Sequence, residues 1–217
     1  MSMGFTLPRR SAVFIADAQG LDFLNSARTS SDGPIDWLQN GEALLRWLEQ
    51  SAIEPPESIQ WLQAHWSAAE LDAIAGQARE LRAWFGGFVR AHMGRSLDGS
   101  ELKELTRLNH LLERQQKYVQ IAAPRNGGAD LEIRTLWRWQ CPQSVLLPIA
   151  EALARVICEE DFRHIRLCEA PSCGLLFVDR TRGLNRRWCS MSTCGNRSKQ
   201  ATRRNRLKRK PQLERRQ

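Results

Sequence analysis

Four cysteines near the C-terminus constrain this chain more than any other feature of its sequence. Cys168 and Cys173 form one C-x4-C pair, Cys189 and Cys194 form a second, and fifteen residues separate the two pairs. Each short pair delivers two sulfurs from one tight turn, and Zn2+ binds thiolates in closed four-coordinate structural sites. The doubled spacing therefore predicts one structural zinc ion held by all four cysteines.

Two other interpretations of these cysteines are two disulfides and a group of buried apolar thiols. The N-terminus shows no secretory leader with charged, apolar and small-residue regions in order. Disulfides are rare in chains that stay in the cytosol. We therefore expect a cytoplasmic protein with a metal site. We interpret Cys141 and Cys158 as core or incidental thiols and His164 as a bystander.

The longest apolar stretch argues against a membrane partner. It covers residues 145–157 and is interrupted by Pro148, Glu151 and Arg155. A transmembrane helix needs about 20 predominantly apolar residues. No membrane anchor is predicted.

Charge divides the chain into two unequal parts. Residues 1–162 hold 16 Lys and Arg against 21 Asp and Glu, a net charge of −5, whereas residues 163–217 hold 16 against 3, a net charge of +13. Clustered cations attract a phosphate backbone whatever its sequence. The C-terminal part is therefore expected to meet a polyanion, although runs of charge are also common on solvated faces and tails.

The first part is expected to be mostly helical. Apolar residues follow a helical period over residues 34–50, 68–88 and about 100–116, and Ser67 with Glu70 predicts a capping box at the start of the second helix. That helix places one continuous apolar stripe on Leu71, Ile74, Ala78, Leu81, Phe85 and Phe88. Such a stripe is typical of a core, and it is too short for sustained coiled-coil evidence.

The pattern then changes to a period of two. Residues 131–139 alternate in polarity after Asn126-Gly127-Gly128, which predicts a β-hairpin, and a last helix is expected over residues 143–161. Five tryptophans that lie on apolar stripes are assigned to the core rather than to an aromatic ligand site: Trp37, Trp47, Trp84, Trp137 and Trp139. His65, His92 and His110 have no nucleophile nearby in sequence, and we predict no enzyme activity.

The cysteine module is expected to end in a basic helix. Residues 165–167 and 175–178 predict two short strands around the first cysteine pair, and Ser190 or Ser192 can cap a helix that runs to about Lys210. This helix has almost no apolar side. The predicted nucleic-acid contacts are Arg186, Arg187, Arg197, Lys199, Arg203, Arg204, Arg206 and Lys208.

Some of these polar residues also have structural interpretations. Arg186, Arg187 and Arg197 can neutralise the net charge of −2 that four thiolates and Zn2+ leave. Asn196 or Asn205 could contact a base edge, and for Asn196 we favour a role in bracing the module.

Two motifs resemble known families. Trp188-Cys189-Ser190-Met191 followed by Cys194-Gly195-Asn196-Arg197 resembles the CGNR zinc finger, and residues 21–26, Leu-Asp-Phe-Leu-Asn-Ser, are similar to the signature of the ABATE domain, with Ser26 in place of threonine. The resemblance implies a bacterial transcription regulator of stress responses with a treble-clef-like finger. It also implies an α+β N-terminal domain with a regulatory role.

Together these features predict an α+β protein in three segments. They are a mainly helical, ABATE-like regulatory domain with a small hairpin (residues 1–162), a zinc finger ending in a long basic helix (163–210), and a basic tail (211–217) expected to be disordered. The expected function is regulation of transcription on duplex DNA, with a homodimer and a small-molecule effector as further partners. Alternatives are an RNA- or ribosome-associated factor and a protein-interaction module. Asp22 and Asn25 could serve a ligand site, but a helix cap or a buried hydrogen bond is favoured.

Overall fold

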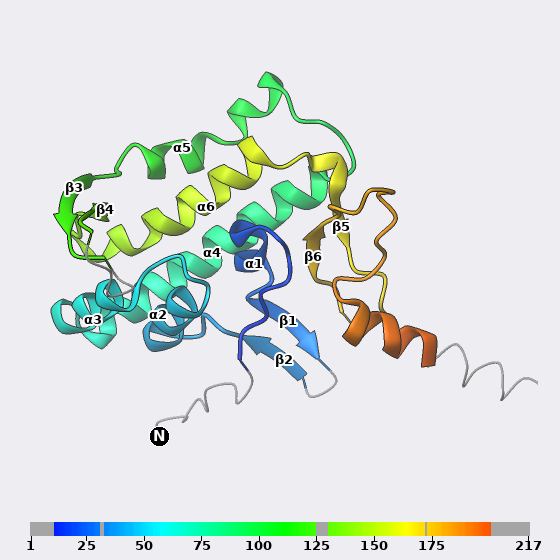
Figure 1. Ribbon diagram of the computed structural model, residues 1–217, viewed down its shortest axis with the longest axis horizontal. Helices are drawn as coiled ribbons and strands as arrows, with labels where there is room; N and C mark the ends of the chain where they lie inside the picture. Colours follow the sequence, from blue (N-terminus) through cyan, green and yellow to red (C-terminus); the bar gives the residue numbers. More distant parts are fainter. Residues whose placement is uncertain (1–10, 31–32, 125–129, 172, 201–217) are drawn as a thin grey trace, which may run out of the picture.

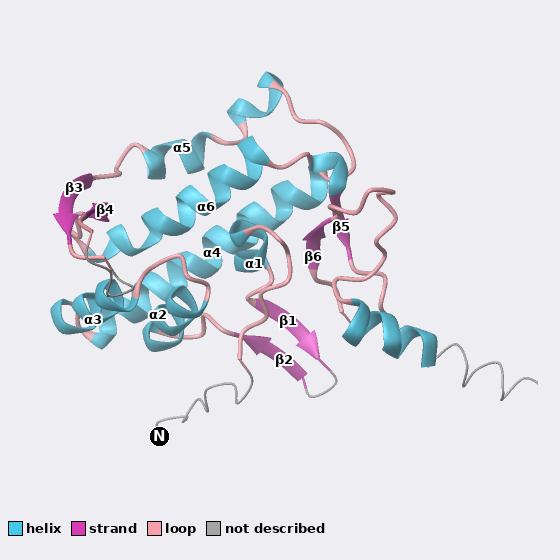
Figure 2. Ribbon diagram, viewed as in Figure 1, coloured by secondary structure: helices cyan, strands magenta, loops and turns pink. Residues whose placement is uncertain are grey.

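The computed structural model describes residues 11–30, 33–124, 130–171 and 173–200, and these residues form an α+β fold (Figures 1 and 2). The α-helices are α1 (Gln19–Leu24), α2 (Gly41–Gln50), α3 (Pro56–His65), α4 (Ala68–His92), α5 (Thr106–Leu112) and α6 (Leu146–Glu159). Short 3-10 helices cover Gly99–Lys103, Pro142–Val145 and Phe162–His164. The strands are β1 (Ala27–Ser30), β2 (Gly33–Asp36), β3 (Lys117–Ala122), β4 (Glu132–Trp137), β5 (Ile165–Leu167) and β6 (Leu176–Val178).

The strands pair as three separate antiparallel hairpins, β1 with β2, β3 with β4, and β5 with β6. The β3–β4 pair confirms the predicted hairpin, and its register places Ile121 opposite Ile133. Both of these side chains are exposed. The predicted turn residues 126–128 lie outside the described part of the chain.

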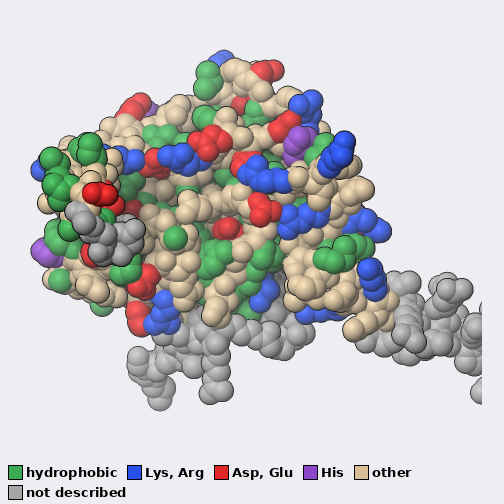
Figure 3. Space-filling model, in the orientation of Figure 1, with side chains coloured by type: hydrophobic (Ala, Val, Ile, Leu, Met, Phe, Trp, Pro, Cys, Tyr) green, Lys and Arg blue, Asp and Glu red, His purple; other side chains and the backbone are tan. Residues whose placement is uncertain are grey.

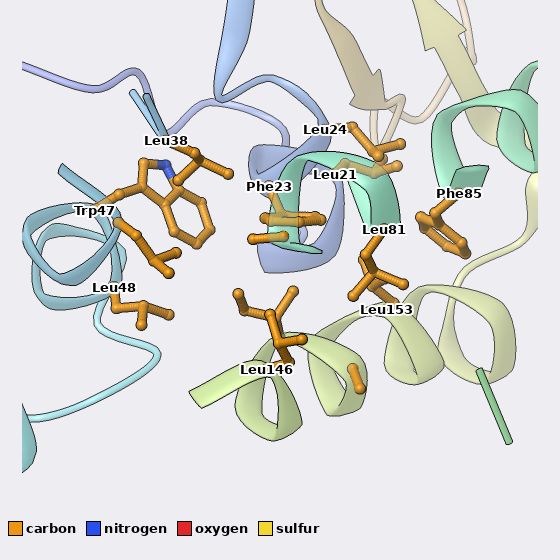
Figure 4. Close-up of a cluster of buried hydrophobic side chains, with 14 of the residues drawn as sticks. Leu21, Phe23, Leu24, Leu38, Trp47, Leu48, Leu81, Phe85, Leu146 and Leu153 are labelled. Carbon is orange, nitrogen blue, oxygen red and sulfur yellow. The ribbon is translucent and has the colours of Figure 1, made fainter. Parts of the chain in front are cut away.

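The main core lies where α1, α2, α4 and α6 meet. Phe23 of α1 packs edge-on against Trp47 of α2 with ring centroids 5.6 Å apart, and leucines of α4 and α6 surround them (Figure 4). Gly20 allows α1 to cross α6 closely, because a Cβ there would lie 2.6 Å from the Ala152 carbonyl oxygen. Helices α2, α4 and α6 lie in segments that were expected to be helical, whereas α1 was not predicted.

Helix α4 follows its predicted pattern in detail. Its N-cap is Ser67, which forms the expected capping box with Glu70. Every residue of the predicted stripe is buried, from Leu71 to Phe88. This pattern could be recognised in the sequence because both the cap and the stripe depend on residues of the helix itself.

Two predicted helices are wrong in part. Gly33–Asp36 is strand β2 rather than the start of a helix, because it pairs with β1, and α2 begins only after Asn40, whose side chain accepts from the Ala43 N–H. The helix expected over residues 100–116 is divided into a 3-10 turn and α5, and Leu102 is 60% exposed. The five tryptophans that were assigned to the core differ in burial. Trp37 and Trp47 are buried, whereas Trp84, Trp137 and Trp139 are half-buried.

Strand β6 belongs to two cores at once. Leu176 and Val178 pack into the main core, whereas Phe177 between them packs with Cys168 and Cys189 in a second, smaller core. Adjacent side chains of a strand point to opposite faces. Burial on both faces therefore explains why this segment is a continuous apolar run. Within the described residues, no helix combines the length and apolarity needed to cross a membrane.

Candidate metal centre

The four predicted cysteines come together beside the β5–β6 hairpin. Cys168 follows β5, Cys173 precedes β6, Cys189 ends the following loop, and Cys194 lies in a single π-helical turn, Met191–Gly195. Their sulfur atoms all lie within 4.8 Å of one another. Residues 26 positions apart in sequence thus form one compact thiol cluster.

The spacing of the sulfurs fits a tetrahedral ion. The Cys173 and Cys189 Sγ atoms are 3.5 Å apart, and those of Cys189 and Cys194 are 3.6 Å apart. Four Zn–S bonds of about 2.3 Å in a tetrahedron place their sulfurs about 3.8 Å apart. The donor set of four sulfurs also suits zinc or an iron–sulfur centre better than a hard cation such as Mg2+.

Electrostatics within the bare cluster favour a bound cation. The hydrogen bond from the Cys189 thiol lowers the pKa of Cys173 to about 5, whereas burial raises the pKa of Cys194 to about 11. The pKa of Cys189 is raised because its proton is held in the hydrogen bond to Cys173. Thiolates at this separation repel one another, and a divalent ion lets all four ionise together.

The helix that follows the cluster begins as predicted. Ser190 is its N-cap, and its hydroxyl accepts from the Thr193 N–H. Gly195 lies against Met191, and a Cβ there would displace the flexible, exposed Met191 side chain. Asn196 donates to the Ser192 carbonyl at 3.2 Å, in line with the bracing role favoured from the sequence. The helix is described as far as Gln200, so the rest of the expected basic helix and the tail from residue 211 lie outside the described residues.

Arg186 is half-buried and is held by contacts within the protein. Its guanidinium donates to the Asp17 carboxylate at 2.7 Å and to the Trp188 and Cys189 carbonyls, and it lies over the Phe177 ring at 4.4 Å. These contacts join the loop before Cys189 to the N-terminal segment. Its guanidinium thus acts as a clamp, which sequence spacing alone does not reveal because Asp17 is 169 residues away.

The other basic residues predicted to contact nucleic acid are exposed, as far as the structure describes them. Arg187 pairs with Glu169 at 2.6 Å, but its side chain remains 61% exposed. Arg197 and Lys199 are exposed on the helix, and Arg166 and Arg182 of the same C-terminal part of the chain are exposed as well. Figure 3 shows Lys and Arg side chains gathered at the finger end of the molecule. Arg203, Arg204, Arg206 and Lys208 lie outside the described residues.

Asp22 and Asn25 are structural links between the N-terminal part and the finger. The Asn25 amide donates to the Leu176 carbonyl at 2.8 Å, and its oxygen accepts from the Leu176 N–H at 2.9 Å. Asp22 accepts from the N–H groups of Ile15 and Ala16, and the Ala16 carbonyl in turn accepts from the Val178 N–H. The favoured interpretation as buried hydrogen bonds agrees with these contacts.

Burial of Asp22 makes the stability of the fold depend on pH. Burial raises the pKa of Asp22 to about 6, although the hydrogen bonds from Ala16 and Ile15 oppose the rise. The folded state therefore binds this proton more tightly than the unfolded state. The tighter binding of this proton contributes fully to the unfolding free energy below about pH 4. This contribution falls by about 1.4 kcal/mol per pH unit above that and is lost as the pH rises through about 6.

We expect Asp22→Asn to remove this dependence. Between pH 5 and 7 the wild-type protein should lose roughly 1–2 kcal/mol of unfolding free energy relative to the variant. Denaturant titrations at several pH values measure this difference, and effects common to both proteins cancel. Asp130→Asn, at an exposed position, is the matched control. A constant difference between wild type and Asp22→Asn would contradict the prediction.

Comparison with protein families agrees with this arrangement. Residues 164–207 match the CGNR zinc finger, and residues 17–160 match the ABATE family, described as "Putative stress-induced transcription regulator". No curated protein matches the chain. The second match covers most of the chain and includes the motif that contains Asp22 and Asn25. The chain therefore belongs to the ABATE family of putative stress-induced transcription regulators and carries a CGNR zinc finger at its C-terminal end.

Proposed function

We propose that this protein is a DNA-binding transcription regulator without catalytic activity, in which one zinc ion bound by Cys168, Cys173, Cys189 and Cys194 holds a basic helix against duplex DNA. The exposed positive charge beside the cysteine cluster is the observation that carries this proposal, since Arg187, Arg197 and Lys199 all face solvent there. Arg203, Arg204, Arg206 and Lys208 extend the same charge along the sequence. We assign Arg186 to the clamp rather than to the DNA surface.

The proposed division of labour follows the chain. Residues 1–162 form the regulatory domain, which senses a ligand or contacts a partner, residues 163–210 form the finger, and residues 211–217 form a basic tail. Phosphate contacts supply affinity that depends strongly on salt. A single finger makes few such contacts, which favours a homodimer on DNA. This role places the protein in the cytoplasm.

Changing three arginines tests the DNA surface. We expect that alanine at Arg203, Arg204 and Arg206 weakens duplex DNA binding at least about tenfold and reduces the salt slope by about 0.9 for each phosphate that the variant no longer neutralises. Affinity of the zinc-loaded full-length protein is measured between about 50 and 200 mM salt. The control carries alanine at Arg46, Arg107 and Arg155, which lie on α2, α5 and α6 outside the finger, so that the same charge is removed.

The competitor nucleic acid separates the alternatives. Tighter binding to duplex DNA than to a structured RNA supports the regulator, whereas preference for the RNA supports an RNA-associated factor. Equal losses in the two triple variants would show that total charge, rather than the finger, sets affinity. Absence of binding to both nucleic acids at low salt would make the finger a protein-interaction module.

A further inference from the structure

The β3–β4 hairpin carries an apolar face that is largely exposed. Its register pairs Val119 with Thr135 and Ile121 with Ile133, and residues opposite each other in an antiparallel pair point to the same face. Val119, Ile121 and Ile133, together with Leu131 just before β4, are each 65–76% exposed. Figure 3 shows hydrophobic side chains gathered at the end of the molecule where Figure 1 labels β3 and β4.

The two faces of the hairpin differ in polarity as they do when one of them is buried. On the face opposite to the isoleucines, Arg134 pairs with Glu132. On the apolar face, the charged strand residue is Lys117, which pairs with Glu151 of α6 and lies 4.3 Å from the centre of the Trp137 ring. An antiparallel sheet with one apolar face normally packs that face against a core. A two-stranded hairpin is marginally stable unless more strands or a helix pack against it. The hairpin therefore has the pattern of a covered sheet, with its apolar face left open.

The size of this face is that of an interaction surface. From their exposed fractions, the four aliphatic side chains present on the order of 500 Å², which equals the largest apolar patch of a typical monomer. Such a patch is often functional. Two copies of the face in contact would bury on the order of 1,000 Å², the lower limit for a specific interface. An interface of this size gives a weak and reversible complex.

The chemistry of the face fits a second copy of the same chain. A two-fold interface brings the same surface of both subunits together, so the surface has to be complementary to itself. An aliphatic face meets this condition, and the one charge among its strand residues is neutralised within its own chain. Two hairpins stacked face to face also supply the additional strands that a single hairpin lacks.

We infer that two copies of this protein dimerise by packing their β3–β4 faces against each other, with Ile121 and Ile133 at the centre of the contact. The inference gives the homodimer of the proposed regulator a defined surface and rests on that proposal for its biological meaning. Figure 1 places the hairpin and the finger at opposite ends of the molecule. Both fingers of the dimer therefore stay outside the interface.

Sedimentation equilibrium of the zinc-loaded full-length protein, from about 1 to about 300 µM, tests the dimer. We expect a reversible monomer–dimer equilibrium with a Kd on the order of 10 µM. Ile133→Asp should weaken it at least about tenfold, because a carboxylate would be buried in an apolar contact without a partner. Leu102→Asp is the matched control, since it places the same charge at an exposed leucine of the 3-10 helix Gly99–Lys103. It should leave the equilibrium unchanged. Leu131→Asp serves as the second variant if Ile133→Asp does not fold.

Mixtures of charged variants test whether the partner is a second copy. Ile133→Asp is mixed with Ile133→Lys in one sample and with Ile121→Lys in another. Each variant alone should be monomeric at concentrations where the wild type is dimeric. Opposite charges then meet only between two chains, so we expect at least one mixture to restore the dimer. The mixture that does so also identifies which positions face each other across the two-fold axis.

Each result bears on the inference. A wild type that stays monomeric over the whole range would overturn it and leave the face to another protein or to another segment of this chain. A dimer that both Ile133→Asp and Leu131→Asp leave intact would overturn it as well, and so would two mixtures without any dimer. DNA binding measured on the same samples reports the proposed function independently. Binding of DNA by a monomeric wild type defeats only this inference, whereas a dimer that binds no DNA defeats only the regulator.

Discussion

Replacing Cys189 with serine is expected to abolish tight zinc binding and to unfold the finger. Structural zinc contributes on the order of 10–16 kcal/mol of apparent binding free energy in finger peptides. Cys189 is buried, and its sulfur lies close to those of Cys173 and Cys194. The small core around it contains few side chains besides the cysteines. Hydrophobic burial alone therefore gives this module little stability.

The measurements are the zinc content of the purified protein and its thermal unfolding with and without a chelator. Wild type should bind one zinc per chain and lose stability when the metal is removed. Cys158 is an exposed free cysteine outside the cluster, so Cys158→Ser is the matched control and should change neither property. A Cys189→Ser protein that retains one zinc and the wild-type melting temperature would refute the proposed ligand set.

The second large effect is expected from Asn25→Ala. This change leaves both the N–H and the carbonyl of Leu176 buried without their partner. Each unsatisfied buried group costs about 1–3 kcal/mol. We expect a total loss of roughly 2–4 kcal/mol, which corresponds to a fall of about 5–15 °C in Tm for a chain of this size. Asn25→Asp should also destabilise, because a carboxylate cannot donate to the Leu176 carbonyl.

Thermal melts measure the total loss, and hydrogen exchange at the Leu176 amide locates it. That amide should exchange much faster in Asn25→Ala, since its acceptor is removed. Asn109→Ala, at an exposed position on α5, should change stability by less than about 0.5 kcal/mol. Unchanged protection at Leu176 would show that Asn25 does not hold the finger in place.

What could be predicted from the sequence depended on the distance between the residues that interact. The capping box of α4 and the first cysteine pair each lie within a few residues, so their spacing carried the information. Strand β2 could not be recognised in the same way, because its pairing with β1 competes with an apolar pattern typical of a helix. The same holds for Leu102, whose exposure depends on how the segment before α5 packs.

In the candidate site, too, contacts between residues far apart in the sequence could not be predicted. The cysteine spacing predicted the cluster, but the roles of Arg186 and Asn25 depend on partners more than 150 residues away. The spacing of Asp22 and Asn25 favoured a helix cap or a buried hydrogen bond over a binding site, but it could not identify their partners.

Strand β6 has a consequence for the fate of the chain in a cell that runs short of metal. Its residues Leu176, Phe177 and Val178 are apolar on both faces, and its outer edge is covered by Asn25 and Ala16. Without zinc to hold the loops around it, we expect this edge to separate from the N-terminal part. An exposed apolar edge strand recruits other chains. Zinc starvation should therefore remove this protein by aggregation and proteolysis, which links its abundance to metal supply.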